Sequence, residues 1–181
     1  SKPAMATNLE VIKGYLDENN IKYRDEGNFL TVVYETENYT NFVNGEKSVL
    51  IIITTETMGH FVQLWVSAYR FSADKNSYNK LALMQTLLKI TYDTKLLQFE
   101  YDPDDGEVRL MVDIPVMDSN LTAFQLIYAL KAILRCLDSE HQNITDAMRH
   151  GLTPESDRER LAAWEEFKKE RAEKRRREFG N

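Results

Sequence analysis

The sequence predicts an α+β fold: an antiparallel sheet of about five strands with helices packed on one face. Segments with strand-like composition come in consecutive runs, three before residue 72 and two after residue 95, and consecutive strands pair antiparallel. Segments with helical apolar spacing flank and separate these runs. A chain of 181 residues, 43% of them hydrophobic, is long enough for one sizeable core. The predicted order is α-β3-α-β2-α plus a charged C-terminal helix.

The first half of the chain supplies one helix and three strands. Leu9, Ile12 and Leu16 recur at i, i+3 and i+7, which indicates a short amphipathic helix. Strand composition and alternation then predict Phe29 to Tyr34, Ser48 to Thr55 and Phe61 to Phe71, with turns at Asn44-Gly45 and Met58-Gly59. The pattern leaves open whether Tyr39 to Val43 forms a further short strand.

The second half supplies two strands between helices. Tyr78 to Tyr92 is predicted as a helix, followed by strands at Leu96 to Tyr101 and Glu107 to Ile114. Thr122 and Gln125 have capping-box spacing. They begin the clearest amphipathic helix of the chain, whose apolar positions are Ala123, Leu126, Ile127, Leu130, Ile133, Leu134 and Leu137.

The chain ends in a separate charged segment. His150-Gly151 is predicted to stop the long helix, and Thr153-Pro154 to start another. We therefore expect an α+β domain over residues 6–152 and an appended helix over 153–181, which either docks or projects. Residues 1–5 read as a vector remnant.

An acidic stretch, Gln98 to Asp113, raises the question of a cation loop. A calcium-binding EF-hand loop needs ligands at positions 1, 3 and 5, glycine at 6 and glutamate at 12. Counted from Asp102, Gly106 falls on position 5 and Asp113 replaces the glutamate. Pro103 and Gly106 instead fit turn chemistry, so this stretch is predicted to be a β-hairpin without a metal.

Composition and charge restrict the partners. From Pro154 onward there are nine Lys/Arg and eight Asp/Glu, so the preceding residues carry 14 basic and 21 acidic side chains. An acidic body repels phosphate backbones, which makes nucleic acid an unfavoured partner. The lone Cys136 and the lack of a long apolar run predict a cytoplasmic protein without a membrane partner.

Recognisable catalytic and metal motifs are missing from the sequence. His60, His141 and His150 form no metal-binding spacing. Asp138 and His141 share a helical face and could hold a metal, but a solvated helix end is favoured, and Cys136 reads as a packing residue. The glycines lie singly, so no phosphate loop is formed. We expect no enzyme activity, no cofactor and no metal site.

An aromatic stripe is the first feature that favours binding. In the strand from Phe61 to Phe71, alternation places Val62, Leu64, Val66 and Ala68 on one face. The opposite face receives the candidate partner-binding residues Phe61, Trp65, Tyr69 and Phe71. If helices cover one side of the sheet, this stripe is a candidate partner or dimer surface. Packing under a loop or under the C-terminal helix is the alternative reading.

The C-terminal segment is the second such feature. Its candidate interaction residues are Trp164, Lys174, Arg175, Arg176 and Arg177. Acidic residues alternate with the basic ones at i to i+4 spacing, as in Glu170 with Lys174. A solvated helix is therefore favoured over an RNA-binding or membrane-surface patch.

The segment from Phe99 to Val116, followed by Leu121-Thr-Ala-Phe-Gln-Leu126, resembles the YbjN-domain proteins, whose fold is similar to that of type III secretion chaperones. The shared pattern is a Tyr-Asp-x-x-x-Gly-Glu hairpin, a strand end read here as Ile114-Pro115-Val116, and a Thr-capped helix. The resemblance covers residues 7–150. It implies a small protein, often dimeric, without catalytic residues to carry over; the charged final helix departs from a minimal domain.

These observations together predict a non-enzymatic protein-binding module. It would be chaperone-like or regulatory, act through an apolar sheet surface, and form a homodimer. Two alternatives stay open at this stage: an enzyme or small-ligand domain whose site forms only on folding, and nucleic-acid binding through the basic C-terminal helix.

Overall fold

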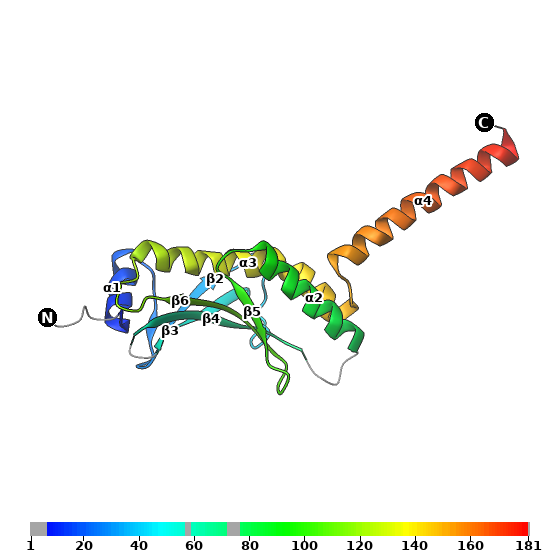
Figure 1. The fold of residues 1–181 in the computed structure, drawn as a ribbon. Coiled ribbons are helices and arrows are strands. Elements are labelled where there is room, and N and C mark those ends of the chain that lie inside the picture. The colour runs from blue at the N-terminus through cyan, green and yellow to red at the C-terminus, as the bar shows by residue number, and fades with distance from the viewer. Residues whose placement is uncertain (1–6, 57–58, 72–76, 181) are drawn as a thin grey trace.

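A computed structural model describes residues 7–56, 59–71 and 77–180. The predicted vector remnant at residues 1–5, and Met58 of one predicted turn, lie outside this range. Figure 1 shows a curved sheet with helices above it. The elements follow the chain in this order: α1 Leu9–Glu18, β1 Arg24–Asp25, β2 Leu30–Glu35, β3 Ser48–Glu56, β4 Phe61–Arg70, α2 Ser77–Asp93, β5 Gln98–Tyr101, β6 Glu107–Pro115, α3 Ala123–His150 and α4 Pro154–Phe179.

The described strands form one antiparallel sheet in the order β1-β2-β3-β4-β6-β5. The predicted α+β class and antiparallel sheet are confirmed, with six described strands where about five were expected. The additional strand is β1, two residues that pair with Leu30 and Thr31. Tyr39 to Val43 is not a strand. Tyr39 instead turns inward and is buried.

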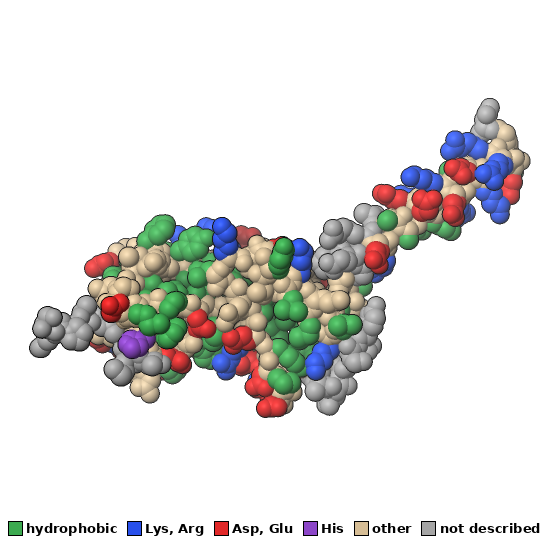
Figure 2. Space-filling view, viewed as in Figure 1, with side chains coloured by type: hydrophobic (Ala, Val, Ile, Leu, Met, Phe, Trp, Pro, Cys, Tyr) green, Lys and Arg blue, Asp and Glu red, His purple; other side chains and the backbone are tan. Residues whose placement is uncertain are grey.

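The C-terminal helix α4 extends away from the sheet and from the other helices (Figure 1). In the space-filling view of Figure 2, basic and acidic side chains are interspersed along its length. The preceding α3 ends at Gly151, whose φ of 65° is left-handed and whose N–H donates to the Ala147 carbonyl. Leu152 N–H also reaches the Asp146 carbonyl, which completes a Schellman-type stop. The predicted helix stop at His150-Gly151 is therefore confirmed.

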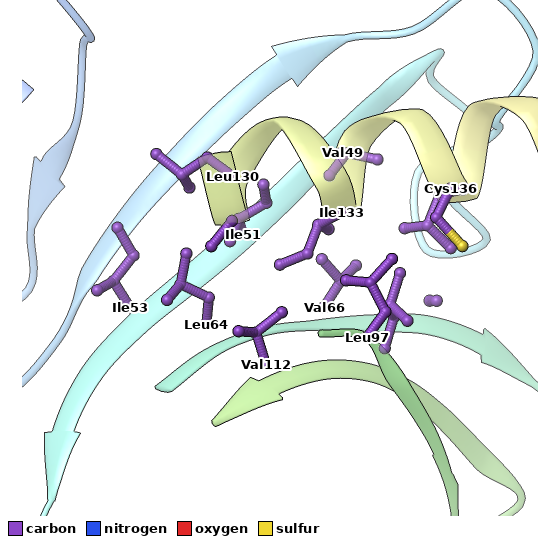
Figure 3. Close-up of a cluster of buried hydrophobic side chains, with 14 of the residues drawn as sticks. Val49, Ile51, Ile53, Leu64, Val66, Leu97, Val112, Leu130, Ile133 and Cys136 are labelled. Atoms are coloured by element: carbon purple, nitrogen blue, oxygen red, sulfur yellow. The ribbon is translucent and has the colours of Figure 1, made fainter. Parts of the chain in front are cut away.

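The core lies between one face of the sheet and helix α3. Strand side chains from β3, β4 and β6 point toward α3 in Figure 3, where Leu64 and Val112 lie below Leu130 and Ile133. All four are fully buried. The Thr122 side chain accepts the Gln125 N–H while the Gln125 side chain accepts the Thr122 N–H, so the predicted capping box fixes where this helix begins.

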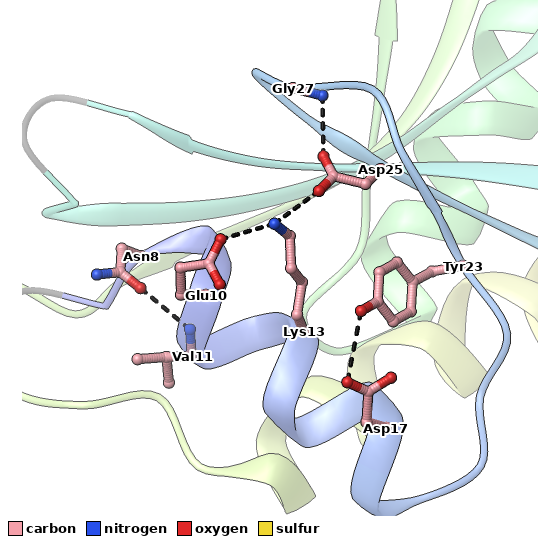
Figure 4. Close-up of polar contacts among 8 residues, drawn as sticks. All are labelled: Asn8, Glu10, Val11, Lys13, Asp17, Tyr23, Asp25 and Gly27. Carbon is pink, nitrogen blue, oxygen red and sulfur yellow. Dashed lines mark hydrogen bonds and ion pairs between the residues drawn. The ribbon is translucent and has the colours of Figure 1, made fainter.

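Polar contacts attach α1 to the strand edge (Figure 4). Asn8 caps the helix by accepting the Val11 N–H at 3.0 Å. The Lys13 ammonium lies 2.6 Å from carboxylate oxygens of both Glu10 and Asp25. Its hydrogen bonds to Asp25 and then Glu10 raise the pKa of Lys13 above its usual value. The contact with Asp25 joins α1 to β1, while Ile12 and Leu16 on the other side of α1 are buried.

The acidic stretch forms the β5–β6 hairpin, as predicted. Asp102 accepts the Asp104 N–H and Asp105 accepts the Glu107 N–H, both at 2.9 Å. These side chains therefore satisfy the turn's own backbone, which is their usual role in turns. Gly106 has a φ of 79°. No group of three or more His, Cys, Asp or Glu side chains among the described residues is arranged to hold a metal ion.

Candidate partner-binding surface

The sheet has a second face that none of the described helices covers (Figure 1). Alternation along β3 places Val49, Ile51 and Ile53 in the core, so Leu50 and Ile52 point to the other side. Leu50 pairs with Val33, and Ile52 pairs with Trp65, which in turn faces Met111. Val33 is 58% exposed and Leu50 40% exposed. We call Val33, Leu50, Ile52, Trp65 and Met111 the apolar band.

Polar side chains border the apolar band on one side. Gln63 donates to Asp113 at 2.7 Å and contacts Thr54 at 3.4 Å across neighbouring strands. Gln98 reaches the same Asp113 carboxylate at 3.4 Å. Paired side chains across strands hold one another in place, so this border is an ordered polar row.

A second polar row borders the other side of the band. Ser67 donates to Glu107 at 2.9 Å, and Glu107 is also ion-paired with Arg109. The Arg109 guanidinium lies 4.3 Å from the centre of the Trp65 ring, a cation–π contact that holds the indole in place. Trp65 is therefore a fixed, partly exposed aromatic between two polar rows, which is the usual composition of a binding surface.

The prediction that four aromatics share this face is wrong for Tyr69 and Phe71. The pairing of β4 with β6 shifts between Ser67 and Tyr69, which is the signature of a β-bulge. The extra residue reverses the alternation, so Tyr69 and Phe71 are 3% and 2% exposed within the core. Phe61 and Trp65 precede the bulge and lie on the open face as predicted.

Tyr69 belongs to a buried aromatic cluster on the helix-covered face. Its hydroxyl lies 2.8 Å from Nδ1 of His141, and the two rings stack with centroids 5.7 Å apart. Tyr39 meets both rings edge-on and donates its hydroxyl to the Ala68 carbonyl at 2.7 Å. Burial raises the pKa of Tyr69 well above its usual value, so its hydroxyl keeps a proton that it can donate to Nδ1 of a neutral His141.

Asp138 and His141 are not a solvated helix end, which corrects the interpretation favoured from sequence. Asp138 accepts the backbone N–H groups of Glu37, Asn38 and Tyr39 at 3.1, 2.6 and 2.8 Å. His141 packs in the aromatic cluster. Both side chains therefore attach α3 to the segment between β2 and β3.

We expect His141 to titrate below its usual pKa. Burial of the imidazole, and then the charge of Arg149, lower this pKa from 6.5, while Asp138 opposes the shift. The histidine thus contributes stability above pH 6.5 that is lost as the pH falls through its lower folded pKa. NMR titration of the imidazole resonances measures the pKa of His141. Tyr69→Phe, which removes the donor to Nδ1, should move the pKa of His141 upward; a wild-type pKa at or above 6.5 would contradict the assignment.

Cys136 lies inside the core, 6% exposed. Burial, and then the charge of Glu140, raise the pKa of its thiol to about 12. A reactive cysteine needs a lowered pKa and access to solvent. The interpretation of Cys136 as a packing residue agrees with this environment.

The predicted residues of the C-terminal segment all lie on α4. Trp164, Lys174, Arg175 and Arg176 line one shallow hollow along the helix. Arg177 is not among its lining residues, and its guanidinium lies 3.9 Å from Glu173. The Trp164 ring stacks on Phe167 with centroids 5.6 Å apart. Trp164 and Phe167 remain 56% and 45% exposed.

Sequence reasoning missed Val33, Leu50, Ile52 and Met111 as members of the open face. The signal was present in β3, whose apolar residues occupy consecutive positions from Val49 to Ile53. An alternating strand with one solvated face would carry polar residues at positions 50 and 52. Leucine and isoleucine there indicate an apolar second face.

Comparisons with known proteins assign no family to this chain. No family model matches the sequence, and no curated protein matches it either. Among solved structures, an uncharacterized protein from Methanothermobacter thermautotrophicus shares 15% identity, with a TM-score of 0.44, over 77% of this chain and 97% of its own. The likeness to the YbjN-domain proteins stays a prediction. In the described part of the chain, no helix has the length and apolar character needed to cross a membrane.

Proposed function

We propose that this chain is a non-enzymatic protein-binding module that acts through the open face of its sheet. The observation that carries the proposal is the apolar band. Its exposed members, Val33 and Leu50, continue directly into Ile52 and Trp65 across paired strands. Burying such a band against a partner gains roughly 25 cal/mol for each Å² of apolar area. Ordered polar rows on both sides would fix the orientation of the partner.

The apolar band is an open surface rather than an enclosed pocket, which supports protein recognition over small-ligand binding. Its side chains project from adjacent strands of one sheet, and an extended or helical protein segment can lie across such a surface. Small-molecule sites are instead concave and enclose most of their ligand. Trp65, near the middle of the band, is of the residue type that most often dominates binding energy.

Removing Trp65 tests the proposal. We expect Trp65→Ser to weaken partner binding by about 2 kcal/mol or more, close to 30-fold, as for other central interface aromatics. The measurements are mass by light scattering and the proteins co-purified from cells, compared with wild type by mass spectrometry. Unchanged mass together with unchanged co-purification would overturn the proposal.

Matched controls separate binding from folding. Val33→Thr with Leu50→Thr reduces the apolar band but keeps side chains that strands tolerate. Val43→Thr changes a valine that is 77% exposed and lies outside the strands. The double variant should lose the partner and Val43→Thr should keep it. Tyr69→Ser, which removes a core side chain, should instead lower the thermal stability.

A further inference from the structure

Helix α4 has an exposed aromatic face that its own domain does not cover. It spans 26 residues, and every described side chain from 162 to 180 is exposed. Phe179 is 78% exposed, and Trp164 and Phe167 are about half exposed. Isolated helices draw little stability from propensity alone and usually bury an apolar stripe. The aromatic side chains of α4 therefore indicate a surface that packs against another molecule.

Charges on α4 are unevenly distributed around the helix. The side chains that border the hollow beside Trp164 and Phe167 include five basic residues and one acidic residue: Lys168, Arg171, Lys174, Arg175, Arg176 and Glu178. The other charged residues from position 159 onward comprise three basic and five acidic ones. Arg171 also lies over the Phe167 ring, 5.7 Å from its centre. Trp164, Phe167, Lys168, Arg171 and Arg175 recur at i, i+3, i+4, i+7 and i+11 and so share one side of α4, which we call the aromatic–basic face.

The open face of the sheet has the complementary composition. The register places five carboxylates on it: Glu35, Glu56, Glu100, Glu107 and Asp113. The same register places three guanidiniums there, Arg24, Arg70 and Arg109, and each has an acidic partner: Glu26, Asp105 and Glu107, respectively. The apolar band is thus bordered by net negative charge, which favours a partner with apolar and basic groups.

The lengths of the two surfaces also agree. A helix of 26 residues is about 39 Å long at 1.5 Å per residue, while β4, with ten residues, spans about 33 Å. Within one chain α4 points away from the sheet, whose open face lies opposite α2 and α3 (Figure 1). The occupant that fits is therefore the α4 helix of another copy.

We propose that α4 of one copy lies across the open sheet face of a second copy. Trp164 and Phe167 contact the apolar band, and Arg171 and Arg175 face the carboxylates around it. This inference rests on the proposed function, since it names the occupant of the same surface. The contact joins two different surfaces, so it links copies head to tail. It also brings a basic face against an acidic domain and so offsets the repulsion between domains.

A second exposed apolar stripe, on α2, is a weaker candidate for this contact. Leu81, Leu88 and Tyr92 are 57%, 69% and 84% exposed. The nearby Lys89 is already paired with Asp93 at 3.1 Å, and it also lies over the Tyr92 ring. This stripe lacks the excess of carboxylates that a basic helix would contact. Leu88→Ser should therefore leave self-association unchanged.

Complementation between two defective full-length chains tests the contact. The first variant, Trp65→Ser, keeps α4 but has an impaired sheet face. The second, Arg171→Glu with Arg175→Glu, keeps the sheet face but reverses charges on α4. We expect each to self-associate at least about tenfold more weakly than wild type, since close charge pairs and central aromatics dominate interfaces. Their mixture should form a one-to-one heterodimer by sedimentation velocity, because one intact contact is restored.

The matched control reverses charges on the other side of α4. Lys169→Glu with Arg177→Glu makes the same change in net charge but lies away from the hollow beside Trp164. Its self-association should stay within about twofold of wild type. Raising the salt concentration should weaken the wild-type contact, since exposed charges are screened. Circular dichroism melts of all variants report whether the fold is retained.

Each contrary result has a defined meaning. A wild-type chain that stays monomeric at 100 µM, an Arg171/Arg175 variant with wild-type mass, or a mixture that stays monomeric would overturn the inference. Loss of assembly with Trp65→Ser but not with the α4 variant would indicate contact between two sheet faces, which keeps the proposed function. If the α4 variant instead loses only salt-sensitive binding to a 20-nucleotide RNA, α4 is a nucleic-acid surface and the inference is wrong.

Discussion

Gly106→Ala is expected to destabilise the protein by about 3 to 5 kcal/mol, lowering the Tm by about 10 °C. A Cβ atom at this position would lie 1.8 Å from the backbone carbonyl oxygen of Phe71. The φ of 79° adds about 1 to 2 kcal/mol for any residue with a side chain. The Gly106 carbonyl also accepts the Phe71 N–H at 2.7 Å, so neither backbone can move away without breaking this hydrogen bond.

Gly45→Ala provides the matched control. Gly45 also has a positive φ, 73°, but nothing lies within 4 Å of the position its Cβ would take. This substitution should lower the unfolding free energy by about 1 kcal/mol, because only the cost of the positive φ applies and no atoms clash. Urea unfolding of both variants measures the difference. Equal losses of unfolding free energy would mean that the close approach between Gly106 and Phe71 is not maintained in solution.

Local chemistry made the β5–β6 hairpin predictable, but not its tertiary contact. Asp102, Pro103 and Gly106 indicate a turn because each acts on its own backbone. Glycine is required at position 106 because the backbone of Phe71, which follows the end of β4 and lies 35 positions earlier in the chain, leaves no room for a Cβ atom. Nothing in the local sequence around Phe71 indicates that neighbour. Sequence patterns report local constraints, and this constraint depends on the pairing of β4 with β6.

The aromatic stripe shows where alternation stops being a reliable guide. A period of two holds only while the ladder is continuous, and the bulge at Ala68 interrupts it. No glycine or proline lies between Ser67 and Phe71 to indicate a bulge. What favours it is the buried site offered by Tyr39 and His141, which come from distant segments. Trp65 was placed correctly because it precedes the interruption.

The helix α4 was predictable as a helix but not as a surface. Its i to i+4 charge pairs indicate a helix, and Lys174–Glu178 is one that forms, at 3.9 Å. Which side of the helix is unoccupied depends on where the rest of the fold lies. The direction of α4 after Gly151 supplies that information, and the sequence could not distinguish docking from projection.

Asp138→Ala is expected to reduce the unfolding free energy by about 2 kcal/mol. The substitution leaves three backbone N–H groups, those of Glu37, Asn38 and Tyr39, without their charged acceptor. These bonds connect α3 to a segment about 100 positions earlier in the chain. Asp138→Asn keeps the size of the side chain but not its charge, so its unfolding free energy should lie between those of wild type and Asp138→Ala. Urea unfolding at pH 7 measures both.

The pH dependence identifies the charge as the cause. Partial burial opposes ionisation of Asp138, but hydrogen bonds from Tyr39, Asn38 and Glu37 together outweigh it and hold the pKa below 3.8. A carboxyl with a lowered folded pKa stabilises the fold above its unfolded pKa, and this stability is lost as the pH falls through the folded value. The difference in unfolding free energy between wild type and Asp138→Asn should therefore be constant near neutral pH and shrink below about pH 4.

Asp146→Ala on the same helix serves as the control. Asp146 accepts a hydrogen bond from Gln142 within α3 at 2.8 Å, and exposed pairs at this spacing contribute about 0.5 kcal/mol or less. We expect Asp146→Ala to lower the unfolding free energy by no more than this amount. If the free-energy difference between wild type and Asp138→Asn did not shrink in acid, the Asp138 contacts would act through packing rather than through charge. We expect a large loss of unfolding free energy only for the Asp138 variants, and we expect it to disappear in acid. This result would identify the Asp138 carboxylate as the acceptor that holds the segment after β2 against α3.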